Sequence, residues 1–143
     1  DTDGKAYANA ATMAQCLLQA AQETGIHITL LPVLYQHSGF DGHAPLKEQK
    51  RFLHSSKAMQ KLLEQLNPIC QAQDAVLGVA PHSLRAVTLE SLKEALDGLH
   101  SLNTAAPIHI HIAEQMAEVN ACLAWSGKRP VELLLHHFAQ LPS

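Results

Sequence analysis

Two histidines and a glutamate lie close together near residue 110. Segment 108–112 alternates isoleucine with His109 and His111, and Glu114 follows shortly afterwards. In a strand, residues two apart point to the same side, so His109 and His111 share a face. Imidazole is a common metal ligand, and a carboxylate can move protons. The spacing predicts His111, nearer the end of the strand, as a metal ligand and Glu114 as a general base and acid.

Each of these residues also has a plainer interpretation. An H-x-H pair alone is a weak signal in a chain with ten histidines. We expect His109 to pack inside the fold through a hydrogen bond, because an unpaired buried imidazole is costly. Glu114 could be an ordinary charge at a helix N-terminus, where the macrodipole favours it.

A second polar group follows an apolar run that ends at Pro81. His82 and Arg85 lie there, and a guanidinium binds a carboxylate through two parallel hydrogen bonds. The pair predicts a site that recognises a carboxylate. The alternative is that Arg85 forms an ion pair with a neighbouring acidic residue such as Glu90.

Three apolar runs predict the strands that position these side chains. They are continuous rather than alternating, which is typical of parallel strands covered on both faces. Helical periodicity separates them, so the predicted order is α-β-α-β-α-β-α-α with right-handed crossovers. Strands are expected near 28–35, 75–81 and 108–112, and helices near 9–24, 49–66, 88–99 and 116–125, with a last one from 130.

Capping residues predict where several helices begin and end. Asn9 and Thr88 are expected N-caps, Gly127 a stop, and Pro130 a first-turn residue. Pro68 is expected to interrupt or kink the second helix. The fold class is therefore α/β, with three consecutive β/α units of a (β/α)8 barrel, which has eight units in about 250 residues. We expect residues 1–143 to form one partial barrel domain of a longer chain.

Composition excludes several classes of protein. Hydrophobic residues make up 47% and charged residues 16%, which is typical of a globular domain rather than a disordered chain. No apolar run reaches the roughly 20 residues of a membrane helix, and no basic cluster suits nucleic acid. Three scattered cysteines without a CxxC pair favour a reducing cytoplasm.

Four segments together resemble the N-formimino-L-glutamate deiminases of the amidohydrolase superfamily, over nearly the whole chain. The H-x-x-E pattern of His111 and Glu114 is shared across that superfamily, whereas the other segments point to this family. The segments are LLPVLY with GF at 30–40, HSLRAVT at 82–88, HIHIAEQ at 109–115 and AWSG-x-RP at 124–130.

The resemblance implies a zinc-dependent barrel enzyme of histidine degradation. It converts N-formimino-L-glutamate and water to N-formyl-L-glutamate and ammonia. His111 would be a zinc ligand, Glu114 the proton carrier, and His82 and Arg85 the residues that hold the glutamate part of the substrate. The resemblance gives His109 no role.

Two alternatives stay open: a related deaminase acting on guanine or another cyclic amidine, and a non-catalytic α/β module that binds a metal structurally. A homodimeric parent is also left open.

The remaining family ligands have no counterparts in these residues, and catalytic zinc usually needs three protein ligands. We therefore expect the isolated chain to be inactive, to retain no stoichiometric zinc after dialysis, and to expose apolar strands that favour aggregation.

Overall fold

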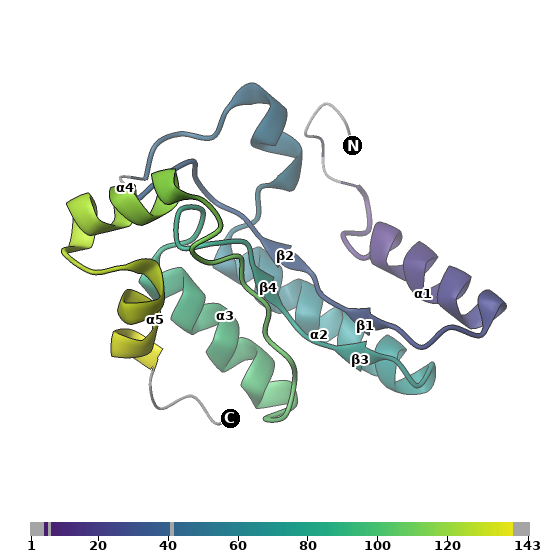
Figure 1. Cartoon of the computed structure of the whole chain (residues 1–143). Coiled ribbons are helices and arrows are strands. Elements are labelled where there is room, and N and C mark those ends of the chain that lie inside the picture. Colours follow the sequence, from purple (N-terminus) through teal and green to yellow (C-terminus); the bar gives the residue numbers. More distant parts are fainter. Residues whose placement is uncertain (1–4, 6, 41, 139–143) are drawn as a thin grey trace.

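The chain folds as a parallel α/β structure with helices against one side of short strands (Figure 1). The computed structural model describes residues 5, 7–40 and 42–138. Its elements, in chain order, are α1 (Thr12–Thr24), β1 (Thr29–Leu30), β2 (Val33–Leu34), the 3₁₀ helix η1 (Lys47–Phe52), α2 (Ser56–Ala72), β3 (Val76–Leu77), β4 (Ala80–Pro81), α3 (Leu89–Leu102), α4 (Met116–Ser126) and α5 (Pro130–Phe138).

The first two predicted strands pair in parallel, but each is split into two short pieces. β1 pairs with β3 and β2 pairs with β4. The N–H groups of Val76, Gly78, Ala80 and His82 donate in turn to carbonyls of residues 28, 30, 32 and 34 at 2.9 to 3.0 Å. Pro32 has no N–H to return, which interrupts the ladder between the pieces.

The third predicted strand lies beside the second as isolated bridges rather than as a regular strand. Val79 pairs with Ile108 and Ser83 with His111, both in parallel. The two bridges are four positions apart on the 79–83 segment and three positions apart on the 108–111 segment, so the 79–83 segment holds one extra residue, as in a β-bulge. Parallel pairing of all three segments is confirmed, whereas closure into an eight-unit barrel stays a prediction.

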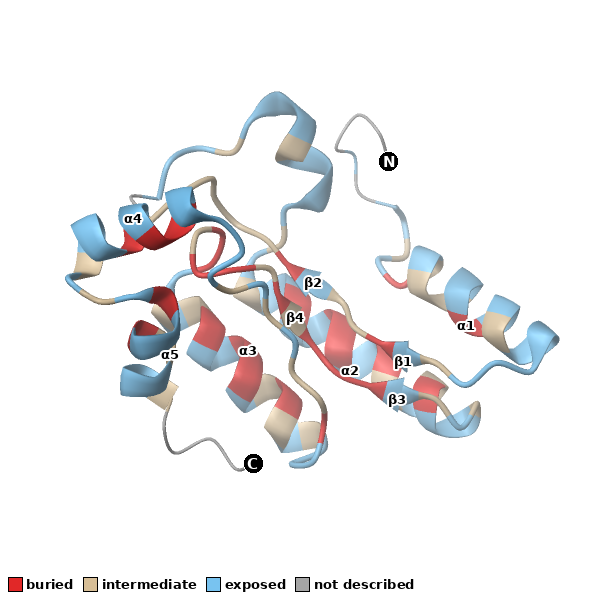
Figure 2. Cartoon of the chain, in the orientation of Figure 1, coloured by how far each residue is buried: buried red, intermediate tan, exposed pale blue. Residues whose placement is uncertain are grey.

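The core lies between the strands and helices α2 and α3. Met59, Leu63 and Leu66 of α2 are fully buried, as is Leu99 of α3. Figure 2 shows the buried residues along the strands and along these helices. The opposite face of the strands is open, since Val33 and Val76 are 45% and 47% exposed. No helix in the described part of the chain is long and apolar enough to cross a membrane.

The predicted helix ends are partly correct. Thr88 caps α3 by accepting from Ser91 N, and Gly127 ends α4 at φ 72°. Asn9 does not cap α1 directly: Ala11 holds the N-cap position, and the Asn9 side chain accepts from Ala11 N. Pro68 does not interrupt the helix, because α2 continues past it to Ala72, so that part of the expectation was wrong. The helix predicted for 49–66 is instead η1 followed by α2, with Ser55 as its cap.

Candidate active site

Three rings line up where neighbouring strands end. Tyr35 follows β2, His82 follows β4, and His111 lies on the third strand segment. The ring centroids of Tyr35 and His82 are 4.8 Å apart, and those of His82 and His111 are 5.0 Å apart at 90°. The carboxyl ends of parallel strands therefore meet at one edge, where parallel α/β proteins place catalytic groups.

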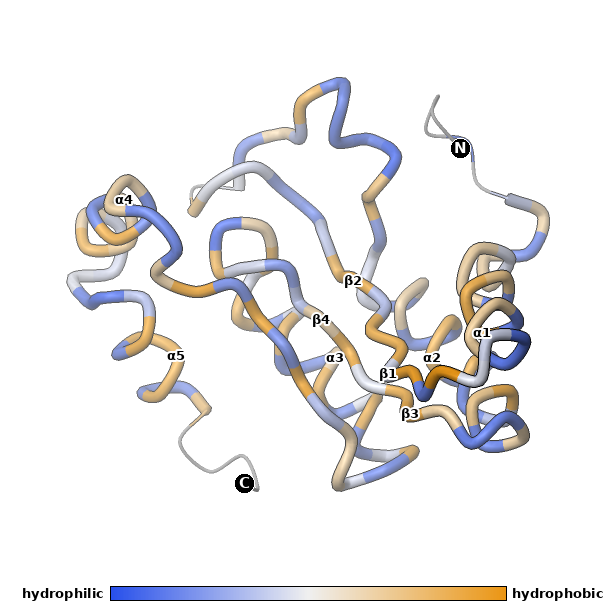
Figure 3. The backbone as a smooth tube through the Cα atoms, turned by 45° about the vertical axis from the view of Figure 1, so that its right-hand side comes forward, coloured by the Kyte–Doolittle hydropathy of each residue, from blue (hydrophilic) through white to orange (hydrophobic). Residues whose placement is uncertain are grey.

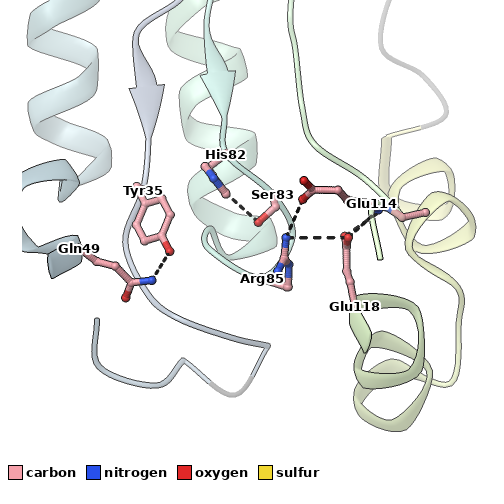
Figure 4. Close-up of polar contacts among 8 residues, drawn as sticks. Tyr35, Gln49, His82, Ser83, Arg85, Glu114 and Glu118 are labelled. Atoms are coloured by element: carbon pink, nitrogen blue, oxygen red, sulfur yellow. Dashed lines mark hydrogen bonds and ion pairs between the residues drawn. The ribbon is translucent and has the colours of Figure 1, made fainter. Parts of the chain in front are cut away.

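Arg85 connects this edge to the segment that carries Glu114 (Figure 4). Its Nη2 donates to Glu114 Oε2 at 3.2 Å and lies 4.0 Å from Glu118 Oε2. Arg85 does form an ion pair with an acidic residue, but the expected partner, Glu90, was wrong. The acidic residues near Arg85 are Glu114 and Glu118, which follow the third strand segment. Arg85 Nε is buried without a hydrogen-bond partner in the described part of the chain, so this guanidinium keeps an unused donor.

Glu118 is a site residue that the sequence analysis missed. It lies in the first turn of α4, is only 2% exposed, and accepts hydrogen bonds from Ala113 N at 3.2 Å and Glu114 N at 2.9 Å. The available signal was an acidic residue three positions into a helix, a place where glutamate often bonds back to the preceding backbone. Glu118, rather than Glu114, is thus the charge at this helix N-terminus.

Burial and neighbouring charges favour a neutral His82. Desolvation is the largest effect that lowers the pKa of His82, and His111 and Arg85 lower it further. Glu114 and Glu118 act in the opposite direction. Its Nδ1 lies 3.1 Å from Ser83 Oγ, which restrains the ring. A neutral imidazole can offer one donor and one acceptor to a ligand.

A cavity of about 520 Å³ opens beside His82. Tyr35 lies in its wall, and its hydroxyl accepts a hydrogen bond from Gln49 Nε2 at 2.8 Å. Arg51 and His54 also line the cavity. Sequence reasoning did not single out Tyr35 or Gln49. The place of Tyr35 at a strand end was the one available signal, whereas Gln49 reaches the site only through η1.

The two histidines of the H-x-H pair are both exposed. The expectation that His109 forms an interior hydrogen bond was wrong within the described structure, which shows no such bond for its ring. Among residues 5, 7–40 and 42–138, no three His, Cys, Asp or Glu side chains form a group that could hold a metal ion. These residues do not fit a zinc ion by themselves, because a catalytic zinc usually has three protein ligands.

The fold is similar to that of an amidohydrolase. The structure matches an amidohydrolase from Brucella melitensis with a TM-score of 0.86 and 49% sequence identity, over 96% of this chain and 30% of that one. The sequence is 43% identical to the formimidoylglutamate deiminase of Pseudomonas aeruginosa over 139 residues. That alignment covers 97% of this chain and 30% of the relative.

The resemblance found in the sequence is thereby confirmed. A more distant relative is the 5-methylthioadenosine/S-adenosylhomocysteine deaminase of Thermodesulfovibrio yellowstonii, 28% identical over 123 residues, which covers 84% of this chain and 25% of the relative. No family model matches the chain. The chain spans about a third of the length of the relatives it matches.

Proposed function

We propose that this chain is part of a metal-dependent hydrolase that deiminates N-formimino-L-glutamate to N-formyl-L-glutamate and ammonia. The similarity to formimidoylglutamate deiminase along almost the whole chain carries the proposal. The three parallel segments would be consecutive β/α units of a (β/α)8 barrel. The free cysteines Cys16, Cys70 and Cys122 suit a cytoplasmic enzyme.

Arg85 and His82 would bind a carboxylate of the substrate. A guanidinium offers two parallel N–H groups to a carboxylate. In this structure, one N–H of Arg85 donates to Glu114. A substrate carboxylate would compete for Arg85 and leave Glu114 free to face the reacting carbon. A neutral His82 could donate a further hydrogen bond without repelling Arg85.

Glu114 would carry the proton. Its side chain is 53% exposed, so it is open to substrate and water. It would accept a proton from the water that attacks the formimino carbon and deliver it to the nitrogen that leaves as ammonia. His111 would supply one ligand of a zinc ion whose other ligands lie outside the described residues, and zinc in such enzymes makes water a better nucleophile.

The second candidate is deamination of an aminopurine, which the relative from Thermodesulfovibrio yellowstonii favours. A purine ring has no carboxylate for Arg85, although the homocysteine part of S-adenosylhomocysteine carries one. The lower identity of that relative, 28% against 43%, makes this the weaker candidate.

Ammonia release by the full-length, zinc-loaded protein tests the proposal. N-formimino-L-glutamate, 5-methylthioadenosine and guanine would be offered separately. We expect release only from N-formimino-L-glutamate, and a loss of about 10²- to 10⁴-fold in Glu114→Gln, which cannot take up the proton. Release from a purine alone would replace the proposed substrate, and an unaffected Glu114→Gln variant would remove the role of Glu114.

A further inference from the structure

Glu118 is a buried carboxylate that the proposed chemistry does not use. Its side chain has no exposed surface, whereas that of Glu114, four residues earlier, is 53% exposed. Burying a carboxylate is costly unless it is paired and hydrogen-bonded. Its oxygens are satisfied by the N–H groups of Ala113 and Glu114 and by the approach of Arg85.

The two backbone bonds differ from those of an ordinary helix cap. In a capping box, a glutamate at the third helical position accepts from the N–H of the N-cap residue. Here the N-cap is Gln115, and Glu118 reaches past it to the two residues before it. Ala113 has φ 53°, a conformation that is uncommon for a residue with a Cβ. Such a conformation persists where its surroundings hold it, and the bond from Ala113 N to Glu118 is one such restraint.

The same carboxylate also faces Arg85. Arg85 Nη2 lies 3.2 Å from Glu114 Oε2 and 4.0 Å from Glu118 Oε2. One guanidinium thus lies between the two carboxylates, and Figure 4 shows Arg85 pointing between them. Glu118 is therefore bonded to the backbone that carries Glu114 and lies near the cation that Glu114 contacts.

We infer that Glu118 is a positioning residue, which fixes the 113–114 backbone and so sets where the Glu114 carboxylate lies relative to Arg85. The inference rests on the proposed function, in which Glu114 moves the proton. Glu118 acts only through Glu114 and Arg85. Proton transfer depends steeply on geometry, and a displacement of about 1 Å can cost about 10²-fold in rate.

The substitution Glu118→Gln in the full-length protein tests this. Glutamine keeps the shape, but its NH₂ group cannot accept from a backbone N–H, so one of the two bonds is lost. We expect kcat on N-formimino-L-glutamate to fall about 10- to 100-fold with KM changed less than about threefold. Hydrogen exchange should speed up in the peptide that contains residues 113–115.

Glu132→Gln is the matched control. Glu132 is the third residue of α5 and accepts from Arg129 N at 3.4 Å, so it caps a helix end without reaching Arg85 or Glu114 in the described structure. This variant should keep the wild-type kcat. Where Glu118→Gln gives no folded protein, Glu118→Asp keeps the charge but withdraws it by one methylene, and the same kcat loss with faster local exchange is expected.

Each outcome decides one point. A fall in kcat confined to the Glu118 variants supports the inference. Wild-type kcat per folded molecule in the Glu118 variants overturns the inference. An equal fall in kcat in the Glu132→Gln control overturns it as well. A wild-type protein that releases no ammonia from N-formimino-L-glutamate contradicts the proposed function itself, and the inference with it.

Discussion

Arg85 is the residue on which substrate choice most depends. It is one-third exposed, contacts Glu114, and has a buried Nε without a partner in the described part of the chain. An arginine side chain that is one-third exposed at the end of a strand can reach a ligand carboxylate. Spacing alone left its partner undecided, because the acidic residue that reaches it lies 29 positions further along the chain.

Arg85→Ala should raise KM for N-formimino-L-glutamate by about 10- to 100-fold, the value of a charge-assisted hydrogen bond of about 1.5–3 kcal/mol. Steady-state kinetics of the full-length protein would measure this. Arg85→Lys keeps the charge without the planar guanidinium. Its KM should lie between the KM of the wild type and that of Arg85→Ala. An unchanged KM in Arg85→Ala would remove the carboxylate-binding role.

His54 should make stability depend on pH. It lies between η1 and α2, and burial lowers its pKa from the ordinary value of 6.5. As pH falls below about 6.5, the unfolded chain takes up a proton that the folded chain resists, so folding stability decreases with falling pH. Above that pH both states are neutral and the effect vanishes.

Thermal melts of the full-length protein at about pH 7.5 and about pH 5.5 would check this. The drop in Tm between them should be smaller in His54→Gln than in wild type. His27→Gln, at an exposed position, should leave the drop unchanged. Equal drops in wild type and His54→Gln would contradict the prediction.

At the scale of elements, neighbouring segments leave no room for a side chain at Gly78. A Cβ built there would overlap the carbonyl oxygen of Pro107 and lie 2.7 Å from Leu31 Cδ2. A backbone carbonyl cannot move aside as a flexible side chain can. Gly78 thus permits the third strand segment, which carries His109 and His111, to lie against the second.

Gly78→Ala should destabilise the fold by about 1–3 kcal/mol, as overpacking does in a well-packed core. Gly98→Ala on α3 is a control of opposite sign: its Cβ would meet only Gln60 at 3.6 Å, and alanine in a helix gains about 0.5–1 kcal/mol over glycine. Urea unfolding of the full-length variants would measure both. A Gly78→Ala variant as stable as wild type would show that the strands can separate without cost.

At the scale of the whole molecule, one face of the strands is covered and the other is open. Helices α2 and α3 cover one face, whereas Val33 and Val76 are about half exposed on strands that are hydrophobic along much of their length (Figure 3). The relatives are about three times as long as this chain. In a complete barrel, the open face would be the interior.

The 143-residue chain by itself should therefore self-associate, since exposed apolar strand faces favour association. Light scattering after size-exclusion chromatography would show a mass that rises with protein concentration. Replacing both Val33 and Val76 with lysine should reduce the association. A chain that stays monomeric over a wide concentration range would contradict the prediction.

The sequence by itself determined the parallel α/β order, several helix ends and the nature of the chemical groups. These depend on local properties. The side chain of Thr88 accepts a hydrogen bond from a backbone N–H three residues away. Gly127 adopts a positive φ without steric strain because glycine has no Cβ. The resemblance to deiminases could also be recognised from the sequence, because it is carried by short segments such as those at 82–88 and 124–130.

Only the tertiary structure decided how those groups meet. The distance between His82 and His111, the partner of Arg85 and the burial of Glu118 all depend on strand register. Register is set by packing and pairing over long separations in sequence, which no local pattern encodes. A shift of one residue would turn His82 or His111 to the opposite face and separate the site.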